Sequence, residues 1–210
     1  MPDWSTISSL ATGGGTLVLA VATFASVRSA NRSARVAEMA LQEQRRPVIV
    51  PSRLSDPDQK INFIDEHWVH ARGGGGTAEH VDGVIYLAIS LRNVGAGIGV
   101  LQGWGIRPGR QRAATDHGAV DDFRTLTRDL YIPAGDIGIW QGALRDDSES
   151  VHGEIAAAIH ERQPITVELL YTDQVGGQRT ISRFALTPVG ERDWLAGVVR
   201  HWYLDQGGPR

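Results

Sequence analysis

The chain has 210 residues, a formal net charge of −3 at pH 7 and no cysteine. This length fits one domain of roughly 100 to 150 residues with an appendage, and neither composition nor charge indicates disorder or a nucleic-acid-binding surface. The absence of cysteine excludes disulfide bonds, thiolate metal sites and a cysteine nucleophile. Lys60 is the only lysine among 21 basic residues, and this arginine bias predicts a bacterial protein from a high-GC genome.

The N-terminal segment is uncharged from Trp4 to Val27. As a helix it would be about 36 Å long, which exceeds a hydrocarbon layer of roughly 30 Å. We therefore predict that residues 1–27 form an N-terminal tail and a transmembrane helix. Two alternatives stay open: a cleaved signal peptide, which would need a positively charged start that residues 1–16 lack, and a buried helix, which would need a polar face.

Arginines follow this segment on one side only, beginning with Arg28, Arg32 and Arg35. Positive charge is retained on the cytoplasmic side, which predicts a single-pass inner-membrane protein with its N-terminus outside and its large domain in the cytoplasm. We predict that Trp4 and these three arginines lie at the membrane interface. Each arginine would attract anionic lipid headgroups by about 1 kcal/mol.

Residues 28–46 are rich in good helix formers and are predicted to continue the helix as a stalk until Pro47, which cannot extend it. Small and apolar residues recur in the helix at alternating spacings of three and four, the pattern of a coiled-coil seam. They are Val27, Ala30, Ala34, Ala37 and Leu41. The lipid bilayer and a second copy of the chain are thus expected partners. In the alternative interpretation alanine merely favours helix, and such a seam buries little area.

Residues 47–210 show apolar alternation at a period of two, with frequent turn residues. We predict a mainly β domain, specifically an antiparallel immunoglobulin-like β-sandwich, because short strands follow one another without the strand–helix alternation of a parallel sheet. The predicted strands lie at 46–51, 84–93, 98–106, 128–144 (two strands and a turn), 165–173, 178–188 and 194–205. One short helix is predicted near 150–162, with Asp147 and Ser148 as candidate N-caps. Residues 73–76 and 107–122 are predicted to be loops.

None of the candidate nucleotide-binding or metal-binding motifs has the residue spacing that such a site requires. The glycines at 97 and 99 lack the third glycine and the following helix of a dinucleotide fingerprint. No two of the seven histidines are four residues apart, and the stretch 146–157 lacks the glycine and glutamate of a calcium loop. We predict no catalytic, cofactor-binding or metal-ligating residue and no cofactor. Solvated carboxylates are expected at Asp56, Asp58, Asp121 and Asp122, and solvated or core-edge histidines elsewhere.

Three stretches resemble a loose class of uncharacterised bacterial membrane proteins that have one N-terminal helix, an Ala/Arg-rich stalk and a β-sandwich domain. They are RRPVIVP (45–51), SLRNVGAGIGVLQGW (90–104) and LLYTDQVGGQRTISRFAL (169–186). The resemblance implies a fold and a topology, and it carries no activity.

Together these features predict a membrane-anchored, non-enzymatic interaction or scaffolding module with an unknown protein partner and no nucleic-acid ligand. Two other functions remain open. The first is a sensor or ligand-binding domain, in which loops 70–82 and 107–122 would form a site at one end of the sandwich. The second is an enzyme of unrecognised type, in which distant histidine and carboxylate side chains would converge.

Overall fold

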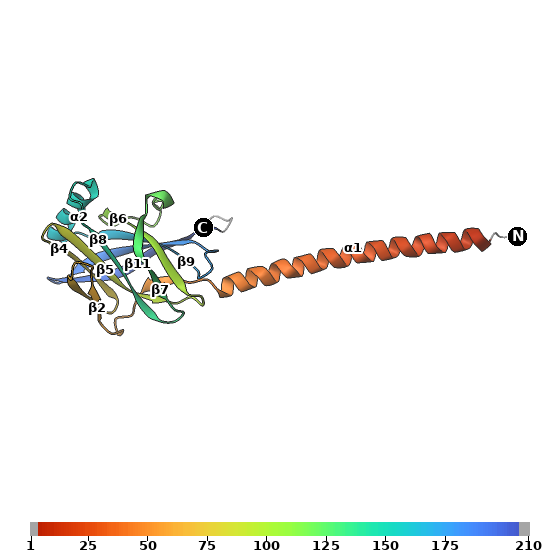
Figure 1. The fold of residues 1–210 in the computed structure, drawn as a ribbon, viewed down its shortest axis with the longest axis horizontal. Helices are drawn as coiled ribbons and strands as arrows, with labels where there is room; N and C mark the ends of the chain where they lie inside the picture. Colours follow the sequence, from red (N-terminus) through yellow and green to blue (C-terminus); the bar gives the residue numbers. More distant parts are fainter. Residues whose placement is uncertain (1–3, 206–210) are drawn as a thin grey trace. The chain divides into compact units, whose positions relative to one another are not determined.

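A computed structural model of the chain describes residues 4–205, with side chains from residue 14 onward. The chain divides into two compact units, Met1–Gln44 and Arg45–Arg210. The first unit is a helix and the second is a β domain (Figure 1). The prediction of a mainly β, antiparallel domain after one long N-terminal helix is confirmed.

The first unit is the single helix α1, Trp4–Gln44, whose 41 residues correspond to about 62 Å. The predicted anchor and stalk segments thus belong to one uninterrupted helix, which ends shortly before Pro47. In the part of the chain that the structure describes, no helix is both long and apolar enough to span a membrane, so the transmembrane prediction for residues 1–27 is not supported.

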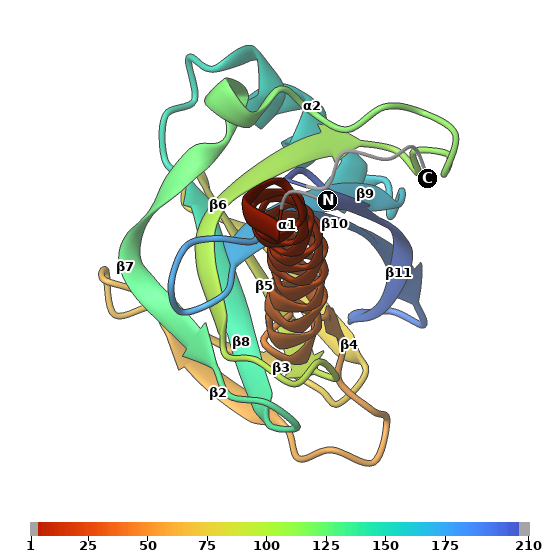
Figure 2. The same cartoon turned by 90° about the vertical axis from the view of Figure 1, so that its right-hand side faces the viewer.

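The β domain is built on a nine-stranded antiparallel sheet that curls on itself (Figure 2). Its order is β1-β5-β4-β11-β10-β9-β6-β7, and β8 also pairs with β5. The strands are β1 (Ile49–Pro51), β4 (Gly75–Val81), β5 (Val84–Asn93), β6 (Gly99–Pro108), β7 (Arg124–Ile132), β8 (Ile137–Leu144), β9 (Ile165–Thr172), β10 (Thr180–Val189) and β11 (Asp193–Tyr203). A separate hairpin joins β2 (Gln59–Asn62) to β3 (Trp68–Ala71), and two short helices are η1 (Val120–Asp122) and α2 (Ser150–His160).

The core lies inside the curl, where β5 and β9 contribute side chains that are almost fully buried. All eight residues of β9 are buried. In β5 the side chains of Ile85 and Leu87 enter the main core, whereas Tyr86 and Ala88 face the other way and pack against the β2–β3 hairpin. The alternation in the sequence therefore separates two apolar faces of β5, and the hairpin covers the second one.

Two local predictions are wrong. The glycines at 75 and 76 lie in strand β4 and not in a loop, and Gly76 pairs with Ile89 of β5. The backbones approach closely here, since a Cβ at Gly76 would lie 2.5 Å from the Ala88 carbonyl oxygen. The glycine is needed there for close packing of strands. The helix near 150–162 is confirmed as α2, but its N-cap is Glu149 without a side-chain cap, so Asp147 and Ser148 do not cap it.

Candidate functional site

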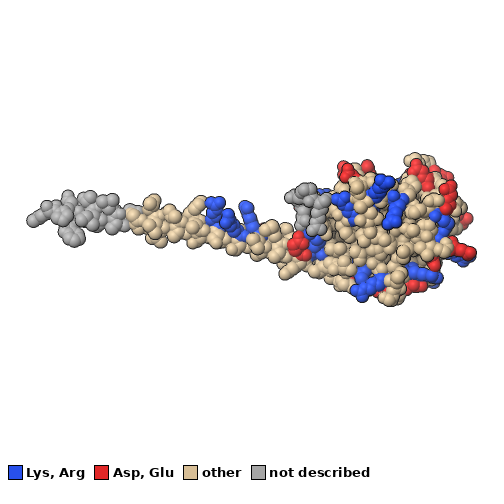
Figure 3. Space-filling model, turned by 180° about the vertical axis from the view of Figure 1, so that it is seen from behind, with Lys and Arg blue, Asp and Glu red and all other residues tan. Residues whose placement is uncertain are grey.

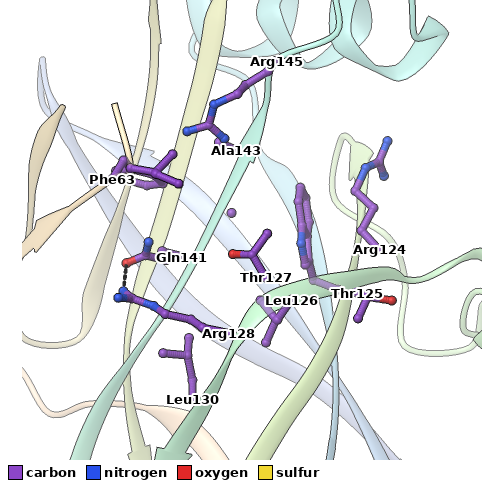
Figure 4. Close-up of a pocket in the computed structure, with 13 residues that line it drawn as sticks. Phe63, Arg124, Thr125, Leu126, Thr127, Arg128, Leu130, Gln141, Ala143 and Arg145 are labelled. Atoms are coloured by element: carbon purple, nitrogen blue, oxygen red, sulfur yellow. Dashed lines mark hydrogen bonds between the residues drawn. The ribbon is translucent and has the colours of Figure 1, made fainter. Parts of the chain in front are cut away.

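A groove of about 220 Å³ opens between β7 and β8 (Figure 4). These two strands follow each other along the chain through the turn at residues 133–136, and strands so connected usually pair as a hairpin. Among the described residues, β7 pairs with β6 and β8 pairs with β5 instead. Each strand therefore presents an edge to the groove that no other strand occupies.

The turn is held by the end of β5, which keeps the two strands apart. Asn93 is fully buried, and its side-chain amide donates to the carbonyl oxygens of Ile132 (3.0 Å) and Gly97 (2.6 Å). Its backbone N–H donates to Asp136 O at 3.0 Å and its carbonyl accepts from the N–H of Gly135 at 2.9 Å. The turn is therefore hydrogen-bonded to the end of β5. On one side of the turn β7 pairs with β6, and on the other side β8 pairs with β5.

A wide irregularity interrupts the pairing of β7 with β6 beside the groove. Leu130 pairs with Leu101 of β6, and Thr125 pairs with Gly103, so the four residues 126–129 face the single residue Gln102. Such a bulge bends its strand and leaves the extra residues unpaired. Residues 126–129 thus have no register partner in β6, and residues 126–128 of this stretch line the groove.

The groove has apolar walls and an aromatic floor. Phe63 and Trp104 are almost fully buried, and Trp104 meets Trp140 edge to face with ring centroids 5.4 Å apart. At the rim, Ile64 is 94% exposed. A large aliphatic side chain in water beside an open groove is suited to contact a bound molecule.

Three arginines surround the groove, and none of the thirteen residues that line it is acidic (Figure 4). Arg124 pairs with Glu149 and lies over the Trp104 ring, 5.2 Å from its centroid. Arg145 donates to Asp65 at 3.0 Å. Arg128 differs, since its partner is the neutral side-chain oxygen of Gln141, at 2.9 Å.

The electrostatics of the rim favour a carboxylate ligand. Partial burial raises the pKa of Asp65, but hydrogen bonds from Tyr86 and Arg145 outweigh it and hold that pKa below its ordinary value. Asp65 thus stays ionised and holds Arg145 in place. Arg128 can exchange its amide partner for a carboxylate, which would give a stronger, charge-assisted hydrogen bond.

The residues predicted at the membrane interface lie in α1. Phe24, Val27, Arg28, Arg32 and Arg35 line one shallow depression on the helix, so the three arginines share a face (Figure 3). The side chain of Trp4 lies outside the described residues.

The three alanines of the predicted self-association seam lie on the other side of the same helix, whereas Val27 borders the depression with the arginines. At 100° per residue, the centre of Ala30, Ala34 and Ala37 is about 160° from that of the arginines. Val27 and Leu41 are 52% and 46% exposed, and the three alanines are exposed as well.

The two loops predicted to form one ligand site do not come together. Part of 70–82 is strand β4, and it lines a depression of about 340 Å³ with Trp194. In that depression Arg72 pairs with Asp193 at 2.7 Å. Residues from 107–122 line a different depression of about 180 Å³ with Thr166 and Glu168.

Two side-chain clusters join residues that sequence reasoning treated as separate. His80 Nδ1 lies 3.2 Å from His160 Nε2, although the two are far apart in the chain, and within the described residues no group of three or more potential metal ligands is found. Asp56 was predicted to be solvated, but its side chain is 10% exposed and accepts two hydrogen bonds from Arg92, at 2.7 and 3.1 Å.

The groove itself was missed from sequence. Arg124, Arg128 and Arg145 match no motif, and the register irregularity that exposes 126–129 depends on pairing with a strand over twenty residues earlier. The only local signal is a run of polar and charged residues in a strand, which is typical of an edge.

Comparisons with known proteins identified no relative in which this groove could be compared. No protein-family model matches the sequence, and searches of curated proteins and of solved structures found no match.

Proposed function

We propose that this protein is a non-enzymatic interaction module that α1 attaches to the inner face of a membrane and that binds a protein partner through the β7–β8 groove. The observation that carries the proposal is the groove itself, an open strand edge surrounded by arginines and apolar side chains. In this proposal the curled sheet serves as an immunoglobulin-like sandwich scaffold. Its support is the antiparallel pairing and the main core, to which β5, β9 and β10 all contribute.

The apolar surface of α1 supports membrane attachment. Leu17, Val18 and Leu19 are each 68% exposed, and consecutive helical residues point about 100° apart, so apolar side chains face water on several sides. Full burial of one such side chain contributes about 1.5–3 kcal/mol. Lipid would provide this burial, and Arg28, Arg32 and Arg35 would add attraction to anionic headgroups.

The size of the β7–β8 groove favours a segment of a protein over a small molecule as its ligand. Pockets for small molecules usually enclose about 300–1,000 Å³. The groove encloses about 220 Å³ and is bordered by strand edges, which suits part of a polypeptide better than a whole small ligand.

Site-specific photocrosslinking in native membranes tests both parts of the proposal. A photoreactive phenylalanine analogue replaces Thr127, which lines the groove, or Val175, which is 65% exposed in the β9–β10 turn. We expect the chain to sediment with membranes and to form a protein adduct from position 127 but not from position 175. Recovery of the chain in the soluble fraction would remove the membrane part, and equal or absent adducts at the two positions would remove the groove part.

A further inference from the structure

The free edge of β7 has the length of a short strand. β7 is the last strand in the sheet order and has nine residues, so its edge away from β6 has no strand partner among the described residues, although a bulge at 126–129 bends it. Backbone N–H and C=O groups along such an edge can pair with an incoming extended segment, which is how many domains bind peptides. A groove between two free edges places that segment beside β7 and in reach of β8.

The charge of the walls selects an acidic segment. Basic side chains come from β7, at Arg124 and Arg128, and from the end of β8, at Arg145, whereas none of the lining residues is acidic. Arg124 and Arg145 are already held by Glu149 and Asp65. Arg128, with its neutral partner Gln141, is therefore the residue that gains most from an incoming carboxylate.

The apolar walls select the remaining side chains of the segment. Leu126 and Leu130 line the groove from β7, and the exposed Ile64 stands at its rim. The groove therefore offers both arginines and aliphatic side chains to a bound segment, which fits a segment that contains both acidic and aliphatic residues.

A second copy of the chain fits the edge poorly. Antiparallel pairing of β7 with another β7 would place arginines 124 and 128 of the two copies near one another, and like charges across a strand pair are destabilising.

Resting on the proposed function, we infer that the partner inserts an extended segment of acidic and aliphatic residues, which adds to β7 as a strand with a carboxylate on Arg128.

The test is fluorescence anisotropy with the full chain in non-ionic detergent and two labelled octapeptides, one of alternating valine and glutamate and one of valine and lysine. We expect the glutamate peptide alone to bind and to slow amide hydrogen exchange at residues 126–129. Arg128→Glu should weaken binding by about tenfold or more, whereas Arg110→Glu, an exposed arginine outside the groove, should change it little. Thr127→Pro, which removes an edge N–H without changing charge, should also weaken binding.

Four results would overturn the inference. Equal binding of the lysine peptide would show that the groove does not select acidic segments. Binding of the glutamate peptide without slower exchange at 126–129 in the unmodified chain would remove strand addition, and this measurement does not depend on the folding of any variant. Self-association lost in Arg128→Glu would identify a second copy as the occupant. Absence of glutamate-peptide binding, together with a persisting adduct from position 127 in membranes, would remove the acidic strand and leave the proposed function in place.

Discussion

The guanidinium of Arg183 is fully buried and donates to Oε1 of Glu168 from Nε at 2.8 Å and from Nη2 at 2.6 Å. Its other N–H groups donate to backbone carbonyls of the segment that crosses above it: Nη1 to Arg112 (2.8 Å) and Thr115 (3.0 Å), and Nη2 to Asp116 (2.7 Å). The other carboxylate oxygen of Glu168 accepts from the N–H of Gly118 at 2.8 Å. One ion pair thus fixes most of the connection from β6 to β7.

Removing one member of this pair should be costly. Arg183→Met leaves the Glu168 carboxylate buried without its partner, and loss of one partner of a buried pair typically costs about 3–5 kcal/mol. We expect a correspondingly lower free energy of unfolding in urea and faster hydrogen exchange across residues 112–118. The double variant Arg183→Met/Glu168→Leu should recover much of the stability. An unchanged urea midpoint for the single variant would contradict this role.

Substitution of glycine by alanine should change the stability of the domain to different extents at two strand positions. A Cβ at Gly76 would lie 2.5 Å from Ala88 O and 2.8 Å from Leu186 Cδ2, whereas at Gly197 nothing lies within 4 Å. We expect Gly76→Ala to destabilise the domain by about 1–3 kcal/mol and Gly197→Ala to change stability by about 0.5 kcal/mol or less. Thermal and urea unfolding of the pair check this, and equal effects would show that the strands at Gly76 can separate without cost.

The histidine pair between β4 and α2 should make stability fall in mild acid. Burial lowers the pKa of His80 from its ordinary value of 6.5, and His160 and His152 lower it further. The folded chain therefore binds fewer protons than the unfolded chain between the two values, so the stabilisation is full above about pH 6.5 and is lost as pH falls through the lowered pKa. We expect His80→Gln to flatten the dependence of the urea midpoint on pH between about 7 and 5, relative to the unmodified chain. Parallel curves would exclude His80 as the cause.

Anionic lipid should bind α1 through its three arginines. At about 1 kcal/mol each, Arg28→Gln, Arg32→Gln and Arg35→Gln together should weaken binding to vesicles containing phosphatidylglycerol by about a hundredfold. Vesicles of phosphatidylcholine alone provide the control, because the substitutions should change little there. Equal losses on both kinds of vesicle would assign the effect to the helix itself.

Self-association of α1 can be tested with single cysteines, since the chain has none of its own. If the alanine seam meets a second copy, oxidation in membranes should cross-link Ala34→Cys into a disulfide-bonded dimer. Arg32→Cys lies on the opposite face and should remain monomeric. Monomer from both variants would remove the coiled-coil hypothesis, and dimer from both would indicate contact without a defined seam.

Sequence patterns located the regular parts of the fold and missed the parts that depend on distant pairing. The strands at β5, β9, β10 and β11 and the helix α2 follow from alternation, turn residues and helix formers close in sequence. Strand β4 was not predicted because its glycines resemble a loop. In the structure β5 and β10 approach Gly76 closely, and β11 approaches Gly75.

The groove could not be predicted for the same physical reason. A side chain such as Gln141 is paired with Arg128 only because β8 leaves the turn along β5, and Asn93 enforces that path from forty residues away. Trp104 and Trp140 lie in the core, where large aromatic side chains of strands are commonly buried, whereas Trp68 is half exposed.

The separation of β7 from β8 leaves one edge of each strand without a strand partner among the described residues. If β7 and β8 paired with each other, both edges would gain backbone hydrogen bonds within the chain, and the groove between them would close. Loss of the Asn93 amide would remove its hydrogen bonds to the carbonyl oxygens of Ile132 and Gly97, whereas the backbone hydrogen bonds of Asn93 to Gly135 and Asp136 would remain. The buried hydrogen bonds that stabilise this turn are therefore the same ones that hold β7 and β8 apart.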